Sequence, residues 1–180
     1  MDVFRLSSSN IITLPNEINA GEILNKLSRV QRLGALSATL VALTAVSGAF
    51  VAGNDAGRAF NSFPKMGDVW IPDDILALTP TWRNIFENTS TVQFDHRILA
   101  ITTFTAVNAS YLWARFLHKD LWLVLPKHAR LCFHLIAGLS WVQVGLGIST
   151  LLLYVPIPLA VLHQVCRLLR YVYHFNPTFE

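Results

Sequence analysis

The stretch Gln93-Phe94-Asp95-His96-Arg97-Ile98-Leu99-Ala100-Ile101 opens a long apolar run and decides how the rest of the chain is interpreted. It places a histidine about one turn inside a predicted membrane-spanning helix. An ionisable side chain at that depth is costly, so it indicates a functional site. A second histidine, His163, lies at a matching place after a later turn. We therefore expect the two histidines to face each other across a helix bundle.

The composition favours a membrane protein. Of the 180 residues, 53% are hydrophobic and 14% are charged, whereas soluble domains carry about 25% charged residues. The basic residues, which give a net charge of +3, lie mostly in short segments beside apolar runs. This distribution is typical of membrane topology signals, and we expect a lipid bilayer and no nucleic acid as a partner. The two cysteines follow no CxxC spacing, which argues against a zinc site or a disulfide framework.

The apolar runs predict an all-α fold, a transmembrane four-helix bundle whose last helix is incomplete. The uncharged run 33–51 would extend about 28 Å as a helix, close to the hydrocarbon thickness of a bilayer. Arg167 and Arg170 interrupt the last run after about eight apolar-rich residues, well short of the ~20 needed to span. The predicted spans are 33–51, 92–116, 131–154 and a partial 159–173.

Two features describe how the predicted helices pack. Ala45, Ala49 and Gly53 recur every four residues, and we expect this small-residue ridge to let a neighbouring backbone approach. Polar residues of the second span, such as Thr103 and Asn108, should face the bundle interior or bond to their own helix backbone.

The rest of the chain is assigned to connections. Residues 1–32 form a lead-in whose amphipathic part is either an interfacial helix or a solvated segment, 33–173 form the bundle, and 174–180 form a tail. The loop 52–91 is rich in turn residues and aromatics, so we expect a structured cap at the membrane surface. The basic connection 115–130 predicts the inner side, which leaves the cap and the turn at 154–158 on the outer side.

This topology places His96 and His163 at a similar depth below the outer surface. Equal depth suits two axial ligands of one haem iron, held edgewise between facing helices. Two alternatives stay open: hydrogen bonding of each histidine to a neighbouring helix, and a metal site or proton relay. The other histidines lie elsewhere and serve as comparisons: His118, His128, His134 and His174.

Charged and polar neighbours of His96 have expected roles of their own. Arg97 is either a partner for a haem propionate, through its planar guanidinium, or an interfacial anchor. Asp95 either orients His96 or faces the loop. Gln93 shares a helix face with His96, but a neutral amide cannot act as a general base. Lys65 in the loop is a weaker candidate for a propionate.

Several motifs together resemble the haem A synthase family, most closely its mitochondrial type, also called a cytochrome c oxidase assembly protein. They occur in the order and spacing of the family, and the similarity covers about 32–164. The motifs are Gly48-Ala-Phe-Val-Ala-Gly-Asn-Asp-Ala-Gly57, Asn61-Ser-Phe-Pro-Lys-Met-Gly67, Val92-Gln-Phe-Asp-His-Arg97, Gln143-Val-Gly-Leu-Gly-Ile-Ser-Thr150 and Leu162-His-Gln164.

The resemblance implies a multi-pass protein of the mitochondrial inner membrane, with eight helices in two similar four-helix halves. This chain resembles the C-terminal half, so His96 and His163 would ligate the iron of a haem b cofactor, with Arg97 as a further cofactor-binding residue. The family reaction oxidises a methyl group of the substrate haem O to the formyl group of haem A for cytochrome c oxidase assembly. Electrons would reach the substrate through the cofactor.

The departures from the family pattern leave open whether this chain is an enzyme. The family's proposed catalytic glutamate lies in the N-terminal half, three residues before a histidine, and Gln93 stands in the analogous place here. After Gln164, two arginines replace the apolar continuation expected of the family. We therefore predict the haem b domain of a haem A synthase that works with an N-terminal half or as a homo-oligomer. The alternative is a non-catalytic bis-histidine haem b electron carrier or assembly factor.

Overall fold

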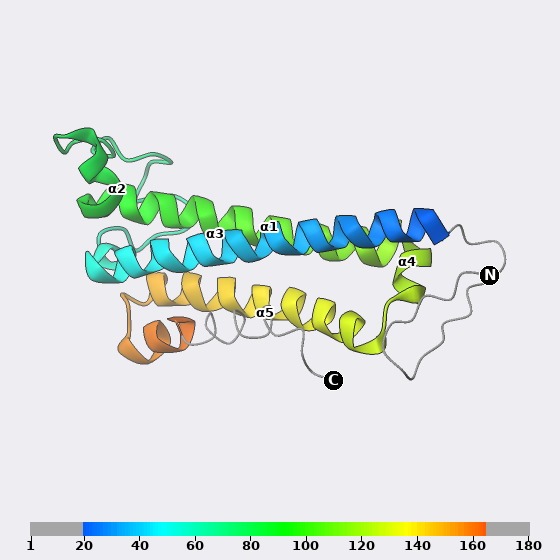
Figure 1. The fold of residues 1–180 in the computed structure, drawn as a ribbon. Helices are drawn as coiled ribbons and strands as arrows, with labels where there is room; N and C mark the ends of the chain where they lie inside the picture. Colours follow the sequence, from blue (N-terminus) through cyan, green and yellow to red (C-terminus); the bar gives the residue numbers. More distant parts are fainter. Residues whose placement is uncertain (1–19, 165–180) are drawn as a thin grey trace.

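The computed structural model describes residues 20–164, and these are helical apart from the loop and short connections (Figure 1). Three long helices lie side by side: α1 (Ala20–Gly53), α3 (Thr89–Leu112) and α5 (Lys127–Leu152). A further helix begins after a turn at 153–156 and is described over 157–164. The short elements are η1 (Ala56–Arg58), η2 (Thr81–Arg83), α2 (Asn84–Glu87), the π-helix η3 (Trp113–Leu117) and α4 (Lys119–Val124).

Helix α3 is the centre of this arrangement because it packs against both α1 and α5. Its polar side chains make the contacts. Thr103 Oγ1 lies 2.7 Å from Thr44 Oγ1 of α1, and Asn108 Nδ2 donates to Ser140 Oγ of α5 at 3.0 Å. Asn108 also donates to the Phe104 carbonyl of its own helix. Both expected uses of these polar residues are therefore confirmed, and hydrogen bonds join helices whose outer faces are apolar.

The outward faces of the long helices carry large apolar side chains. Leu36 on α1 and Trp141 on α5 are 62% and 63% exposed, and Ile101 on α3 is 53% exposed. Within the described residues, two helices are long and apolar enough to cross a membrane, those at Gly21–Gly53 and Lys127–Leu152. Exposed apolar faces of this extent are typical of contact with lipid or with further protein.

The helices extend past the predicted spans. Helix α1 is continuous from Ala20, so the amphipathic part of the lead-in and the first span form one element. Helix α3 begins three residues before the predicted span 92–116 and gives way to the π-helix at Trp113, and α5 covers most of 131–154. Residues 157–164 are helical where the partial fourth span begins, while 165–173, the tail 174–180 and residues 1–19 lie outside the described residues.

Two of the three residues of the predicted small-residue ridge of α1 are not buried against a neighbouring helix among the described residues. Ala49 and Gly53 are exposed, and a Cβ added to Gly53 would meet nothing within 4 Å. The face that contacts α3 instead carries Thr44, which bonds to the Leu99 carbonyl and to Thr103. Hydrogen-bonding hydroxyls, and not the smallest side chains, fix the rotation of α1 about its axis.

The loop 54–88 is ordered by asparagines. Asn84, which is fully buried, donates to the Leu78 and Thr81 carbonyls and accepts from the Leu78 N–H. Asn88 is the N-cap of α3, where its Oδ1 accepts from the N–H groups of Ser90 and Thr91. Asn88 Nδ2 donates to the Asp74 carbonyl and to Asn84 Oδ1. One side chain therefore joins the start of α3 to the loop, which confirms a structured cap.

Replacing Asn88 with alanine should lower the free energy of unfolding by about 1–3 kcal/mol. The change removes two capping bonds and also the bonds from Asn88 Nδ2 to the Asp74 carbonyl and to Asn84 Oδ1. Thermal unfolding of the detergent-solubilised chain measures the effect. Asn25→Ala is the matched control because Asn25 lies exposed on α1. Equal melting temperatures for the two variants would contradict this role of Asn88.

An ion pair joins the first turns of α1 to α4 at the opposite end of the molecule. Lys26 Nζ contacts Asp120 Oδ2 at 2.5 Å and Glu22 Oε1 at 2.7 Å. The hydrogen bond from Lys26 holds the pKa of the Asp120 carboxyl below its usual range. Because the folded pKa is depressed, the pair stabilises the fold above the unfolded value of about 3.9 and is lost as the pH falls through the folded value.

Replacing Asp120 with asparagine should therefore weaken the acid sensitivity of folding. The wild type should lose more of its melting temperature than Asp120→Asn between pH 7 and pH values below about 4, where the wild-type carboxylate becomes protonated. Melting curves across this range measure the difference. The control is Asp68→Asn, an exposed loop residue that forms no ion pair within residues 20–164. Parallel pH profiles for wild type and Asp120→Asn would refute the linkage.

Candidate functional site

His96 of α3 and His163 of the 157–164 helix line the same two cavities at the loop end of the bundle. The larger cavity has a volume of about 210 Å³ and lies among the end of α1, the end of α5 and the last described helix. The smaller, of about 60 Å³, lies deeper between α1, α3 and α5. The structure thus brings together the two histidines that the sequence singled out. Small residues form much of the larger cavity's wall: Gly48, Ala52, Gly57, Gly147 and Ala160.

Ser47 holds the ring of His96. This residue lies two turns before the end of α1, and its Oγ is 2.9 Å from His96 Nδ1. The same hydroxyl donates to the Thr44 carbonyl at 2.9 Å. A serine on the neighbouring helix therefore contacts the ring of His96 at Nδ1.

Gln143 holds the ring of His163. Its Nε2 lies 3.0 Å from His163 Nδ1 and donates to the His163 carbonyl at 2.7 Å. Gly147, one turn further along α5, allows this close approach, since a Cβ there would lie 2.9 Å from His163 Cε1. The Gln143 amide therefore holds the histidine against α5, and the lack of a side chain at Gly147 leaves room for the imidazole ring.

Gln93 and Arg97 fasten the loop over this site. Gln93 Nε2 donates to the Ala56 carbonyl at 2.7 Å and to the Phe60 carbonyl at 3.2 Å. Arg97 donates to the carbonyls of Phe60, Pro64 and Lys65 at 3.0–3.2 Å and to Gln93 Oε1 at 3.1 Å. The terminal nitrogens of Arg97 are thus bonded to the loop, and its buried Nε has no partner among the described residues.

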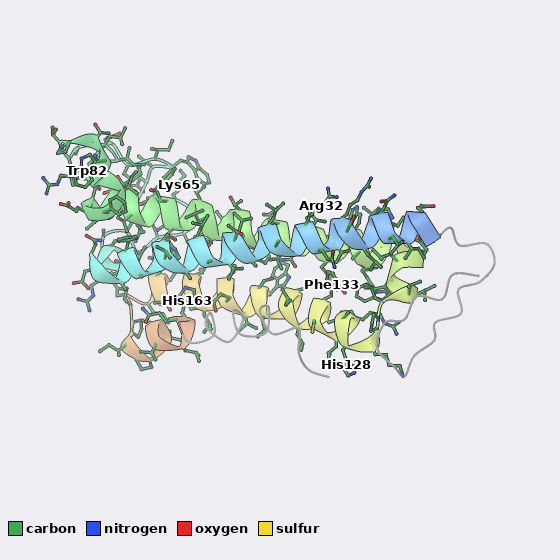
Figure 2. All side chains as sticks on the ribbon, in the orientation of Figure 1. Arg32, Lys65, Trp82, His128, Phe133 and His163 are labelled. Carbon is green, nitrogen blue, oxygen red and sulfur yellow. The ribbon has the colours of Figure 1, made fainter. Side chains whose placement is uncertain are left out.

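The remaining predicted residues lie apart from the histidine pair. The Lys65 ammonium lies 5.9 Å from the centre of the Trp70 ring. His134 bonds to Tyr111 through Nδ1 at 3.1 Å, and His118 packs on Trp113. Figure 2 shows Lys65 and Trp82 at the loop end, His163 toward the same end, and Phe133 and His128 toward the end where α5 begins. His174 lies outside the described residues.

The donor set suits a group that brings ligands of its own. Among residues 20–164, no three His, Cys, Asp or Glu side chains lie close enough together to hold a bare metal ion, and protein sites for bare metals such as zinc use at least three. A porphyrin supplies four nitrogens and needs axial ligands only, which two histidines provide. A side chain from another helix contacts Nδ1 of each histidine, the ring nitrogen through which metal-binding histidines are commonly oriented.

Comparison with known proteins gives a consistent result. A family model described as cytochrome oxidase assembly protein matches residues 6–170. The haem A synthase COX15 of Homo sapiens is 50% identical over 140 residues, which are 78% of this chain and 33% of the human protein. The Arabidopsis thaliana protein of that name is 49% identical over 137 residues, 76% of this chain and 29% of the relative.

A bacterial protein, the haem A synthase of Nitrosospira multiformis, is 45% identical over 130 residues, 72% of this chain and 35% of the relative. The chain therefore spans about a third of the length of these relatives. No solved structure matches it.

Replacing Arg97 with methionine should loosen the loop over the site. The change keeps an unbranched side chain that reaches as far as the Arg97 Nε but removes the donors to three loop carbonyls. The amides of Met66 and Gly67, which are bonded to Val69 and Ser62 within the loop, should exchange with deuterium on the order of tenfold faster, because bonds from a charged donor contribute ~1.5–3 kcal/mol. Hydrogen exchange read by mass spectrometry measures this rate.

Arg83→Met is the matched control for the loop. Among residues 20–164, the Arg83 side chain bonds to Glu87 and Thr79 only, so exchange should rise around 79–87 and stay constant at Met66 and Gly67. If Arg97→Met left those two amides unchanged, Arg97 would not be the residue that holds the loop.

Proposed function

Because the chain belongs to the COX15-CtaA family of cytochrome oxidase assembly proteins, we propose that it forms the haem b-binding domain of a haem A synthase. His96 and His163 are the axial ligands of one haem iron. The observation that carries this proposal is their position on the walls of the same two cavities, with both Nδ1 atoms in contact with side chains of other helices.

The residues around the pair support binding of a flat, largely apolar group. Gly48, Gly57 and Gly147 have no side chains to fill the space where the group would lie, and Val51 and Leu151 offer it apolar contact. A third cavity of about 120 Å³ borders this region and is lined by Arg97, Phe104 and Gly147. Arg97 lines it with a buried Nε that has no partner in the described residues, which suits a carboxylate at the edge of a bound haem.

A bis-histidine haem supplies one-electron transfer when bound. The part of this chain's residues would be to hold and shield it: the imidazoles of His96 and His163 would bind its iron, and the loop fastened by Gln93 and Arg97 would limit access of water from the outer side. In the whole enzyme, electrons would pass from this domain to the site where the haem O methyl group is oxidised to the formyl group of haem A. Another domain or a second copy of the chain would supply that site.

The exposed apolar helix faces and the eukaryotic relatives support a location in the mitochondrial inner membrane, crossed more than once. A second function also has a specific observation in its favour. Gln93 is neutral, 2% exposed and bonded to loop carbonyls, so the position analogous to the family's proposed catalytic glutamate is structural here. This favours a non-catalytic haem b electron carrier or assembly factor. Conversion of added haem O to haem A by the purified chain would favour the enzyme over the carrier.

Replacing either His96 or His163 with alanine should abolish low-spin haem binding, because each change removes an axial ligand. Oxidised and dithionite-reduced visible spectra of the detergent-purified chain, with the extracted haem identified by chromatography, measure this. His134→Ala is the matched control and should keep the wild-type spectrum, since His134 bonds to Tyr111 away from the cavities. An unchanged low-spin spectrum in either ligand variant would refute the assignment.

A further inference from the structure

The two histidines are held by partners of different chemistry. A serine hydroxyl contacts His96 Nδ1, and a glutamine amide contacts His163 Nδ1. A neutral imidazole carries its proton on one ring nitrogen, and the hydrogen bond at that nitrogen determines which one. Each partner therefore favours one tautomer of the ring that it contacts.

Ser47 requires a proton on His96 Nδ1. A hydroxyl has one proton to donate, and the Ser47 proton is used on the Thr44 carbonyl at 2.9 Å, an acceptor that cannot donate in return. With the Ser47 proton on that carbonyl, the ring donates in the contact of 2.9 Å between Ser47 Oγ and His96 Nδ1. His96 consequently has an acceptor lone pair at Nε2, which is the form that binds iron.

Gln143 requires the opposite of His163. The His163 carbonyl lies 2.7 Å from Gln143 Nε2. This contact fixes the orientation of the amide, because turning it over would bring two acceptor oxygens together. The same NH₂ group lies 3.0 Å from His163 Nδ1 and donates to it. His163 Nδ1 is then an acceptor, and the ring proton lies on Nε2.

In this orientation the amide oxygen of Gln143 is left without a partner in the described part of the chain. Gln143 Oε1 is buried and has no hydrogen-bond partner among residues 20–164, and Gln143 lines the smaller cavity together with both histidines. A buried acceptor without a partner costs ~1–3 kcal/mol. If the amide turned over, Oε1 would gain a partner by accepting from His163 Nδ1–H, and the bond from Nε2 to the His163 carbonyl would be lost.

We propose that Ser47 and Gln143 are positioning residues that give the two histidines opposite ring tautomers, so that His96 is set for iron and His163 takes an iron ligand's form only when the Gln143 amide turns over. The inference rests on the proposed function for its role in haem binding, but the tautomers exist without haem. His96 has the iron-binding tautomer before haem is bound, whereas His163 must change its tautomer. Gln143 therefore tunes how strongly His163 binds the iron.

The first experiment uses the full chain in detergent without haem, labelled with ¹⁵N-histidine. Nuclear magnetic resonance identifies which ring nitrogen carries the proton, with signals assigned from the His96→Ala and His163→Ala variants. We expect Nδ1–H for His96 and Nε2–H for His163. Ser47→Ala should convert His96 to a mixture of tautomers, and Gln143→Glu should move the His163 proton to Nδ1, because a carboxylate only accepts. Ser110→Ala is the control, since Ser110 bonds to the Ala106 carbonyl of its own helix.

The second experiment measures the reduction potential of the haem-loaded chain. Gln143→Glu should lower the midpoint potential, because a carboxylate bonded to Nδ1–H makes the imidazole a stronger ligand. Ser47→Ala should raise it, because His96 Nδ1–H loses its acceptor. Ser110→Ala should leave it unchanged.

Each result has a definite meaning. The same tautomer on both histidines of the wild type, or a His163 proton that stays on Nε2 in Gln143→Glu, would overturn the inference even if haem binds normally. Failure of the wild type to bind haem would overturn the proposed function and leave the tautomer result standing. If Gln143→Glu does not fold, the wild-type spectrum and Ser47→Ala still decide the matter.

Discussion

The backbone carbonyls of the loop set the main constraint on this structure. A backbone carbonyl taken away from water needs a donor, and carbonyls of the loop segment 56–65 receive donors from outside the loop. Helix α3 provides them from one face, where Gln93 and Arg97 lie one turn apart and bond to four loop carbonyls and to each other. His96 lies within the same stretch of helix. The residues that fix the loop and the residue proposed to bind iron are therefore placed by one rigid element.

The histidine pair shows how the same side chain is held in two ways by helices that differ in sequence. On α1, the Ser47 hydroxyl donates to the Thr44 carbonyl of its own helix and accepts from His96 Nδ1. On α5, an amide reaches both a ring nitrogen and a backbone carbonyl of the histidine's own helix. A site built from two identical residues is thus chemically unequal on its two sides. Redox centres with two like ligands are commonly tuned through such outer hydrogen bonds.

Much of the fold follows from simple signals in the sequence. Uncharged apolar runs located α1 and α5, and the histidine beside an apolar run pointed to the cavities. The rotation of α1 about its axis did not follow from the sequence, because Ala45, Ala49 and Gly53 suggest one packing face and the neighbouring Thr44 suggests another. The contact between the hydroxyls of Thr44 and Thr103 identifies the face that packs against α3.

The partners of the histidines and of Arg97 were also missed, for a related reason. Ser47 and Gln143 are single polar residues in apolar helices, and no pattern within one helix says which neighbour they reach. The role of Arg97 depends on a loop more than thirty residues earlier folding back over α3. The bonds of greatest interest here link segments far apart in the chain, whereas sequence periodicity reports only on each segment by itself.

The length of α1 has a consequence for how the site is set in a membrane. Its 34 residues extend about 51 Å, against ~30 Å of hydrocarbon. In the proposed membrane setting, the basic residues Arg29 and Arg32 mark the inner boundary, and Ser47 lies about four turns beyond Arg32. The uninterrupted helix then sets the distance between the inner boundary and Ser47. One inserted residue between Arg32 and Ser47 would shift the serine by 1.5 Å and rotate it about 100° away from His96, so the depth of the site and the direction of its key hydroxyl are fixed by a single count of residues.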